Sequence, residues 1–235
     1  MTRCDPKLWV VIPAAGIGSR FGDGTPKQYR QLAGKPVIEW ALLPFIARPD
    51  VAGIVVAVAD EDNDWSSGQQ VDPRVLIAKG GSERSESVLN SLHTLKRRAD
   101  DMDWVLVHDA ARPCLDSGDL DRLIKTLSDD PVGGLLATPV HDTLKRDAGD
   151  GRVGSTVERR GLWRAMTPQM FRYGLLLKAI GKAVSERLGV TDESMAVELL
   201  GERPVLIQGR ADNMKITSRE DILRAESVLS TRRGI

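Results

Sequence analysis

The side chains most suited to binding or catalysis are two cations beside a glycine-rich stretch. An apolar run at 8–13 leads into residues 14–22, AAGIGSRFG, which contain Arg20, and Lys27 follows shortly afterwards. Glycines let backbone N–H groups approach a phosphate closely, Arg20 can form two parallel hydrogen bonds to phosphate oxygens, and Lys27 adds a compact charge. This combination predicts a loop that binds a polyanion such as a nucleoside triphosphate.

The loop matches neither of the two best-known phosphate-binding motifs. The dinucleotide fingerprint requires a glycine where Phe21 stands. The Walker motif requires the sequence Gly-Lys-Ser/Thr, whereas Lys27 lies between Pro26 and Gln28. The loop alone therefore leaves a simpler alternative, a glycine turn that carries two solvated cations.

Carboxylates and a further lysine stand at two other predicted loop edges. Asp109 follows the apolar run 104–108, and Asp212 and Lys215 lie close together near the C-terminus. A carboxylate at the carboxyl end of a central strand is well placed to hold Mg²⁺, a cation that prefers oxygen ligands. Because side chains alternate along a strand, His108 is expected to point away from the metal and to have a structural role. The set predicts a site for a metal ion and a polyphosphate.

The elements that must position these residues alternate between strands and helices. Short runs rich in Val, Ile and Leu, typical of strands buried on both faces, occur at 8–13, 53–59, 74–78, 104–108, 134–138 and 204–208. Helical patterns occur at 36–48, 84–98, 117–128, 172–187, 192–200 and 218–231, and Met214–Thr217 is predicted to be a short strand. The alternation predicts an α/β fold, a mostly parallel twisted sheet with helices on both faces.

The segment 141–162 interrupts this alternation. Its polar runs flank residues 148–152, AGDGR, a composition typical of a hairpin turn. An isolated hairpin with so little apolar surface is marginally stable, so we interpret it as an arm that packs on a second subunit, with an unpacked excursion as the alternative. We predict a single domain over 1–235, a protruding β-hairpin arm and a homodimer.

Composition narrows the classes of partner. The 235-residue chain has 33 basic and 33 acidic residues, so bulk charge indicates neither nucleic acid nor an anionic membrane. No apolar run approaches the ~20 residues of a membrane span, and little chain precedes the first strand, so we expect neither an anchor nor a leader peptide. Cys4 and Cys114 lie far apart, and the histidines lack zinc-site spacing. This usage is typical of a reduced, cytoplasmic protein without zinc.

Seven sequence blocks occur along nearly the whole chain in the order of a known enzyme family. They are PAAGIGSRFG with TPKQY at 13–29, GGSERSESV at 80–88, VHDAARP at 107–113, HDTLKR at 141–146, LWRAMTPQMF at 162–171, TDES at 191–194 and GRADNMKIT at 209–217. Together they resemble the 2-C-methyl-D-erythritol 4-phosphate cytidylyltransferases of the non-mevalonate isoprenoid pathway. The resemblance implies a Rossmann-like nucleotidyltransferase fold. It also implies transfer of CMP from CTP to the phosphate of the polyol, with release of pyrophosphate.

The resemblance also implies roles for residues of this chain. Residues that would hold the triphosphate are Ala14, Ala15, Gly16, Gly18, Arg20 and Lys27. Gly81, Ser87 and the backbone near Ala110 would receive the cytidine, and Asp109 and Asp212 would coordinate Mg²⁺. The polyol phosphate would be bound by Arg112, Thr167, Thr191 and Lys215, with Thr143 and Arg159 of the partner subunit. Arg20, Lys27 and Lys215 are the expected catalytic residues; Ser82 receives no role.

Three alternatives accompany this interpretation. A cytidylyltransferase for another polyol phosphate, such as ribitol 5-phosphate, would use the same triphosphate loop, and a sugar-1-phosphate nucleotidyltransferase would prefer UTP or TTP. A nucleotide-binding protein without catalysis would be expected to lack some of the charged residues, yet all those named above are present.

The implied reaction needs no general base. The attacking phosphate oxygen is already an anion at neutral pH, so we expect none.

Overall fold

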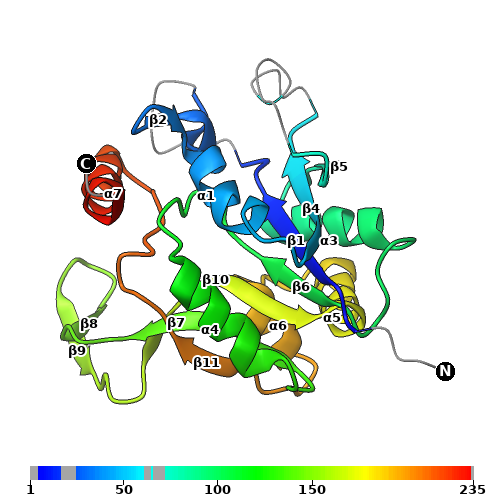
Figure 1. The fold of residues 1–235 in the computed structure, drawn as a ribbon. Helices are drawn as coiled ribbons and strands as arrows, with labels where there is room; N and C mark the ends of the chain where they lie inside the picture. Colours follow the sequence, from blue (N-terminus) through cyan, green and yellow to red (C-terminus); the bar gives the residue numbers. More distant parts are fainter. Residues whose placement is uncertain (1–4, 17–24, 61–64, 66–71, 234–235) are drawn as a thin grey trace.

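In the computed structural model, which describes residues 5–16, 25–60, 65 and 72–233, a seven-stranded sheet forms the centre (Figure 1). Its strands are β1 (Leu8–Pro13), β4 (Val51–Val58), β5 (Val75–Lys79), β6 (Trp104–Val107), β7 (Gly133–Pro139), β10 (Trp163–Arg172) and β11 (Val205–Gln208). Their order is β11-β7-β10-β6-β1-β4-β5, and every neighbouring pair is parallel except those formed by β10. The predicted mostly parallel sheet of a Rossmann-like fold is confirmed.

Helices cover both faces of this sheet, as predicted. They are α1 (Val37–Ile46), α3 (Arg84–Leu95), α4 (Ser117–Leu127), α5 (Tyr173–Ser185), α6 (Glu193–Glu198) and α7 (Arg219–Arg233). Because side chains alternate along β1, Val10 and Ile12 join a core with α1 and α4, whereas Trp9 and Val11 join one with α3, α5 and α6. Among the described residues, no helix combines the length and apolar composition needed to cross a membrane.

The C-terminal helix α7 lies outside these two cores. A third, smaller cluster packs α7 against α1 and against the segment after β6. Trp40, Cys114, Ile216 and Ala225 are among its buried members. Short elements beside it are η2 (Lys27–Tyr29), β2 (Gln31–Leu32) and β3 (Lys35–Pro36). This arrangement places the turn of helix that carries Lys27 near the carboxyl end of β1.

One strand was not predicted, and one predicted strand is wrong. Residues of β10 were not predicted to form a strand, because Pro168 cannot donate to a ladder and the segment lacks regular alternation. The register of β10 against β7 shifts between Ala165 and Gln169, and this irregularity accommodates the proline at the centre of the sheet. Met214–Thr217 is not a strand; the N–H of Ile216 donates to the oxygen of Ala111 at 2.8 Å, without a ladder.

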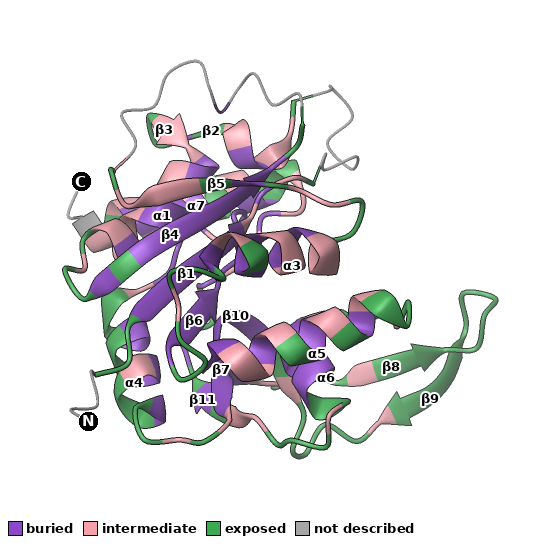
Figure 2. Cartoon of the chain, turned by 90° about the vertical axis from the view of Figure 1, so that its right-hand side faces the viewer, coloured by how far each residue is buried: buried purple, intermediate pink, exposed green. Residues whose placement is uncertain are grey.

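The predicted hairpin arm is present. Strands β8 (Leu144–Asp147) and β9 (Val153–Val157) pair antiparallel as a separate two-stranded sheet. Figure 2 shows them projecting from the body of the protein with mostly exposed residues. At the turn, the Asp147 carboxylate accepts hydrogen bonds from the N–H groups of Gly149 and Gly151. Both glycines have positive φ, a conformation that explains their place in the turn.

Candidate active site

A cavity of about 540 Å³ opens where the segments after β1, β5 and β6 meet. This is the carboxyl edge of the parallel strands, the edge at which α/β sheets bind ligands. The predicted site residues that line it are Ala14, Ala15, Gly16, Lys27, Gly81, Ser87, Asp109, Ala110 and Lys215. Gly18 and Arg20 lie outside the described residues. The structure thus brings together residues from four of the seven sequence blocks.

Two backbone segments line the part of this cavity where the sequence predicts a nucleotide. The N–H of Ala14 donates to the oxygen of Ala57 at 2.8 Å, and the Gln28 side chain donates to the oxygen of Ala14 at 2.6 Å. Opposite them, the N–H of Gly81 donates to the Ser87 hydroxyl at 3.0 Å. Ser87 therefore supports the loop before α3 from within. The outcome is a preformed wall of backbone groups, as suits a nucleotide site.

Asp109 is the electrostatic centre of the cavity. Its buried carboxylate contacts Lys215 Nζ at 2.9 Å, Arg84 Nε at 3.1 Å and Arg112 Nε at 3.4 Å. Burial by itself raises the pKa of Asp109, but the positive charges of Arg84, Lys215 and Arg112 together hold it far below its usual range. The carboxylate is consequently ionised at neutral pH, the state in which it can accept a cation.

His108 is a structural residue, as predicted. It is fully buried and packs edge-on against Phe45 of α1, with ring centroids 5.4 Å apart. Burial lowers the pKa of His108 to about 4, so the ring is neutral. Because Nε2 lies 3.0 Å from the carbonyl oxygen of Arg112, this nitrogen carries the proton, and Nδ1 accepts from the Thr167 hydroxyl at 3.0 Å.

Thr167, predicted to bind the polyol phosphate, lies beneath Asp109 instead of on a cavity wall. Its buried hydroxyl accepts a hydrogen bond from the N–H of Asp109 at 3.0 Å while donating to His108. Its carbonyl oxygen accepts from the side chain of Asn213 at 2.8 Å. In this arrangement Thr167 joins β10 to the end of β6 and fixes the backbone of Asp109.

A second cavity of about 470 Å³ adjoins the first, because Lys215 lines both. Its wall includes Arg112, Arg164 and Arg224, and Arg112 also donates to the oxygen of Asn213 at 2.7 Å. Of the residues predicted to bind the polyol phosphate, the structure brings Arg112 and Lys215 together. Thr191, Thr143 and Arg159 are exposed and line neither cavity; the first lies two residues before α6, and the other two lie on the arm of the same chain.

Asp212, the second predicted metal ligand, is held by arginines. Its carboxylate contacts Arg232 at 2.7 Å and Arg210 at 3.0 Å. Partial burial opposes ionisation, but these hydrogen bonds and charges lower the pKa of Asp212 overall. It lines neither of the two cavities. In the part of the chain that the structure describes, no three His, Cys, Asp or Glu side chains are grouped to hold a metal.

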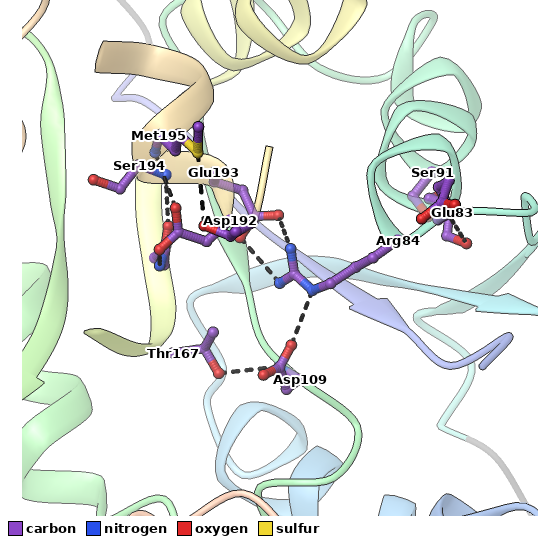
Figure 3. A network of polar contacts seen from close by, with 12 residues as sticks. Glu83, Arg84, Ser91, Asp109, Thr167, Asp192, Glu193, Ser194 and Met195 are labelled. Atoms are coloured by element: carbon purple, nitrogen blue, oxygen red, sulfur yellow. Dashed lines mark hydrogen bonds and ion pairs between the residues drawn. The ribbon is translucent and has the colours of Figure 1, made fainter. Parts of the chain in front are cut away.

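Sequence reasoning missed a buried ion pair beside Asp109. Arg84, at the start of α3, contacts Asp109 on one side and Glu193, the first residue of α6, on the other (Figure 3). Glu193 is fully buried, and Arg84 lines the main cavity. Arg84 lies in the block GGSERSESV and Glu193 in the block TDES. The basic residue of the first block and the acidic residue of the second were the signal that could have indicated this ion pair.

Comparisons with known proteins show which enzyme family the chain is similar to. The family model described as 2-C-methyl-D-erythritol 4-phosphate cytidylyltransferase matches residues 8–231. The chain is 51% identical over 219 residues to the enzyme of that name from Pseudomonas putida (strain GB-1), covering 92% of this chain and 93% of the relative.

Solved structures show the same likeness. A crystal structure of 4-diphosphocytidyl-2C-methyl-D-erythritol synthase is similar with a TM-score of 0.84 and 42% identity, covering 96% of this chain and 99% of that one. The 2-C-methyl-D-erythritol 4-phosphate cytidylyltransferase of Francisella tularensis is similar with a TM-score of 0.83 and 34% identity, covering 94% and 99% of the respective chains.

Proposed function

The chain belongs to the 2-C-methyl-D-erythritol 4-phosphate cytidylyltransferase family, and from this membership we infer that its main cavity transfers CMP from CTP to that polyol phosphate. The products are 4-diphosphocytidyl-2-C-methyl-D-erythritol and pyrophosphate, in the synthesis of isoprenoid precursors. The observation that supports this most directly is that Lys27, Lys215 and Asp109 line one cavity with the backbone after β1. Such a set suits a triphosphate and the charge that develops during its cleavage.

CTP occupies the main cavity in this proposal. The backbone at Ala15 and Gly16 and the ammonium group of Lys27 bind the triphosphate, together with Gly18 and Arg20. Ala14, whose N–H donates to Ala57 and whose oxygen accepts from Gln28, holds the start of this loop in place. The cytidine lies between the loop of Gly81, which Ser87 supports, and the backbone after Asp109. Two facing walls of this kind bind a flat base without large movement.

The donors of the cavity fit a Mg²⁺ ion that arrives with the triphosphate. Asp109 offers an ionised carboxylate oxygen on the cavity wall, and Mg²⁺ commonly combines one or two carboxylates with substrate phosphates and water. Asp109 would hold the ion; Asp212 would join it only after exchanging its contacts with Arg210 and Arg232. When bound, the ion offsets phosphate charge and orients the α-phosphate.

The remaining chemistry belongs to the cationic side chains. The phosphate of the polyol attacks the α-phosphate of CTP as an anion, so repulsion between two anions is the main obstacle, and a base is not needed. Lys27 and Lys215 lower this repulsion and stabilise the charge that moves onto pyrophosphate. Arg112, whose cavity adjoins the first at Lys215, binds the incoming phosphate, and Thr191 is a further proposed contact. Thr167, whose buried hydroxyl is engaged with Asp109 and His108, contributes by holding the backbone of Asp109 instead of binding the phosphate directly.

The arm supplies the rest of the polyol site in a homodimer. This part of the proposal is supported by the exposure of Thr143 and Arg159 and by the projection of β8 and β9 from the body (Figure 2). Arginine and threonine suit a phosphate, because they provide several N–H and O–H donors. On a neighbouring subunit these two side chains complete the pocket that Arg112 and Lys215 begin.

Pyrophosphate release over a matrix of substrates tests the proposed function. With Mg²⁺ present, CTP, UTP, TTP and ATP are each combined with 2-C-methyl-D-erythritol 4-phosphate, ribitol 5-phosphate or glucose 1-phosphate. The highest kcat/KM is expected for CTP with 2-C-methyl-D-erythritol 4-phosphate. A higher value with ribitol 5-phosphate, or with UTP or TTP and glucose 1-phosphate, would assign a different transferase activity. No release in any combination would indicate a nucleotide-binding protein without catalysis.

A further inference from the structure

We propose that Arg84 and Glu193 act as a positioning pair for Asp109. Glu193 holds the guanidinium group of Arg84, and Arg84 in turn holds one oxygen of the Asp109 carboxylate. The inference rests on the function proposed above, because it concerns the same cavity. It adds two residues to the machinery of the reaction, one of which, Glu193, lies wholly in the interior.

The geometry of Arg84 allows it to serve two carboxylates at once. Its Nε donates to Oδ1 of Asp109 at 3.1 Å. Its two terminal nitrogens donate to the two oxygens of Glu193, with 3.1 Å between Nη2 and Oε2 (Figure 3). A guanidinium group is a planar fork with five donors, so one edge can bind Glu193 bidentately while Nε faces Asp109. A lysine at this position could not make all three bonds.

The contact with Arg84 determines which way the Asp109 carboxylate is turned. Arg84 takes Oδ1, whereas Lys215 and Arg112 contact Oδ2. Each oxygen therefore has its own partners, and rotation of the carboxylate would break contacts on both sides. Because Lys215 lies on the Oδ2 side and lines both cavities, the orientation of Asp109 also sets the position of Lys215.

Glu193 is itself attached to the central sheet. Gln169 of β10 donates from its side-chain nitrogen to Asp192 at 2.9 Å and accepts from the N–H of Ser194 at 2.7 Å. The start of α6 is thus fixed on both sides of Glu193. Arg84 carries this constraint to the start of α3, next to the loop of Gly81 that lines the cavity. The pair connects β10, α3 and the end of β6 around one carboxylate.

Charge explains why a carboxylate is needed at position 193. The single negative charge of Asp109 is in contact with three positive charges, those of Arg84, Arg112 and Lys215, so without a second carboxylate this buried place would carry excess positive charge. Glu193 offsets the charge of Arg84 and keeps its terminal nitrogens away from the cavity. Burial raises the pKa of Glu193, while Arg84 acts in the opposite direction. Without Glu193, Arg84 would be free to turn its fork onto Asp109 or onto a bound phosphate.

Single and double variants of the full-length protein test this inference. Arg84→Lys, Glu193→Gln and the combined variant are assayed by pyrophosphate release from CTP and 2-C-methyl-D-erythritol 4-phosphate. Each single variant is expected to lower kcat by about 10-fold or more, because small displacements of reacting groups carry large costs. The KM for CTP should change much less than kcat, since the loop of Gly81 keeps its other supports, the bonds of Gly81 to Ser87 and of Gly80 to Val58. The double variant should be no slower than the slower single one, because both changes break one unit.

Arg74→Lys is the matched control. Arg74 makes a comparable bidentate contact with Asp72, with Nη2 and Oδ2 2.8 Å apart, at a place that lines neither cavity. It should lower thermal stability while leaving kcat within about twofold of the wild type. Circular dichroism and the melting temperature verify folding of every variant. If a single variant does not fold, Arg84→Gln with Glu193→Gln, which removes both charges together, replaces it with the same expected loss of kcat.

The outcomes separate this inference from the proposed function. Folded Arg84→Lys and Glu193→Gln proteins with kcat near that of the wild type would overturn the positioning pair. So would a double variant whose loss equals the product of the two single losses, because the residues would then act independently. If the wild type releases no pyrophosphate from any substrate pair, the proposed function fails, and the pair loses its role with it.

Discussion

At Asp109, burial and charge act on the pKa in opposite directions, and charge prevails. Three cations within hydrogen-bonding or ion-pair distance keep the carboxylate ionised although little of its side chain is exposed. The same cations leave the cavity positive overall, which suits a triphosphate. Lys27 and Lys215 face this space from opposite ends of the sequence. The chemistry proposed for this site is therefore electrostatic, and each cation is expected to contribute a large part of the rate acceleration.

Lys27→Ala should leave the fold intact and lower kcat by about 10²-fold or more, because removing one preorganised charge from a transition state has a cost of that size. Pyrophosphate release and circular dichroism provide the measurements. Lys35→Ala is the control: Lys35 lies on β3, forms an exposed ion pair with Glu39 at 4.0 Å and lines neither cavity. Turnover of Lys27→Ala close to that of Lys35→Ala would remove Lys27 from the catalytic site.

At the scale of elements, the cavity depends on the close approach of two loops. Gly80, in the loop after β5, packs against Ala15 in the loop after β1, and its N–H donates to the oxygen of Val58 at the end of β4 at 2.7 Å. A Cβ atom on Gly80 would lie 2.1 Å from the Cβ of Ala15 and 3.0 Å from the oxygen of Val58. Only glycine permits this approach. The width of the proposed nucleotide site is thus set by backbone packing between neighbouring elements.

Gly80→Ala should push the loop of Ala15 away from the loop before α3. We expect a loss of about 1–3 kcal/mol in the free energy of unfolding, as is typical of overpacking, together with a raised KM for CTP. Urea denaturation and initial-rate kinetics measure the two effects. Gly181→Ala in α5 is the control, because its Cβ would meet no atom within 4 Å and should be neutral or stabilising by up to ~1 kcal/mol. Equal behaviour of the two variants would show that the loops do not require this contact.

At the scale of the whole molecule, contacts within one chain do not explain how the arm is stabilised. Its strands pair with each other, and Val153 leaves 65% of its surface exposed. A two-stranded hairpin with exposed apolar residues gains little stability alone. Packing on a second copy of the chain would cover this surface and would bring Arg159 to the neighbouring pocket. Coverage of the exposed apolar surface and completion of the neighbouring pocket are thus the two reasons for proposing a homodimer.

Mixing two inactive variants tests whether the arm crosses between subunits. Arg159→Ala alone should raise the KM for the polyol phosphate far more than the KM for CTP. A heterodimer with Lys27→Ala then places both defects in one pocket if the arm crosses, so the other pocket has an intact loop and an intact arm. Random exchange should restore about a quarter of wild-type activity under conditions where Arg159→Ala alone is inactive.

An arm that serves its own chain predicts a different result. Each pocket of the heterodimer would then keep one defect, and mixing would restore nothing. Exchange of subunits is verified separately, for example with tagged chains and native mass spectrometry. The absence of recovered activity despite proven exchange would refute the crossing arm.

Local sequence determined most of the scaffold and much of the cavity. Buried strands such as β1, β4 and β6 are short runs of apolar residues, and a parallel sheet hides both faces of each strand, so composition alone identified them. Loops that follow such strands meet at one edge of the sheet. For this reason Lys27, Asp109 and the glycines near them could be predicted to lie together.

Tertiary structure decided what depends on contacts between distant residues. Strand β10 is held in the centre by pairing with β6 and β7 although its own sequence contains Pro168. Asp212 meets Arg232 rather than lining the cavity, and Arg84 meets Glu193, which is 109 positions away in the chain. No local periodicity records such pairings. They arise because a buried charge is costly without an opposite charge beside it, and only the folded backbone brings that partner within reach.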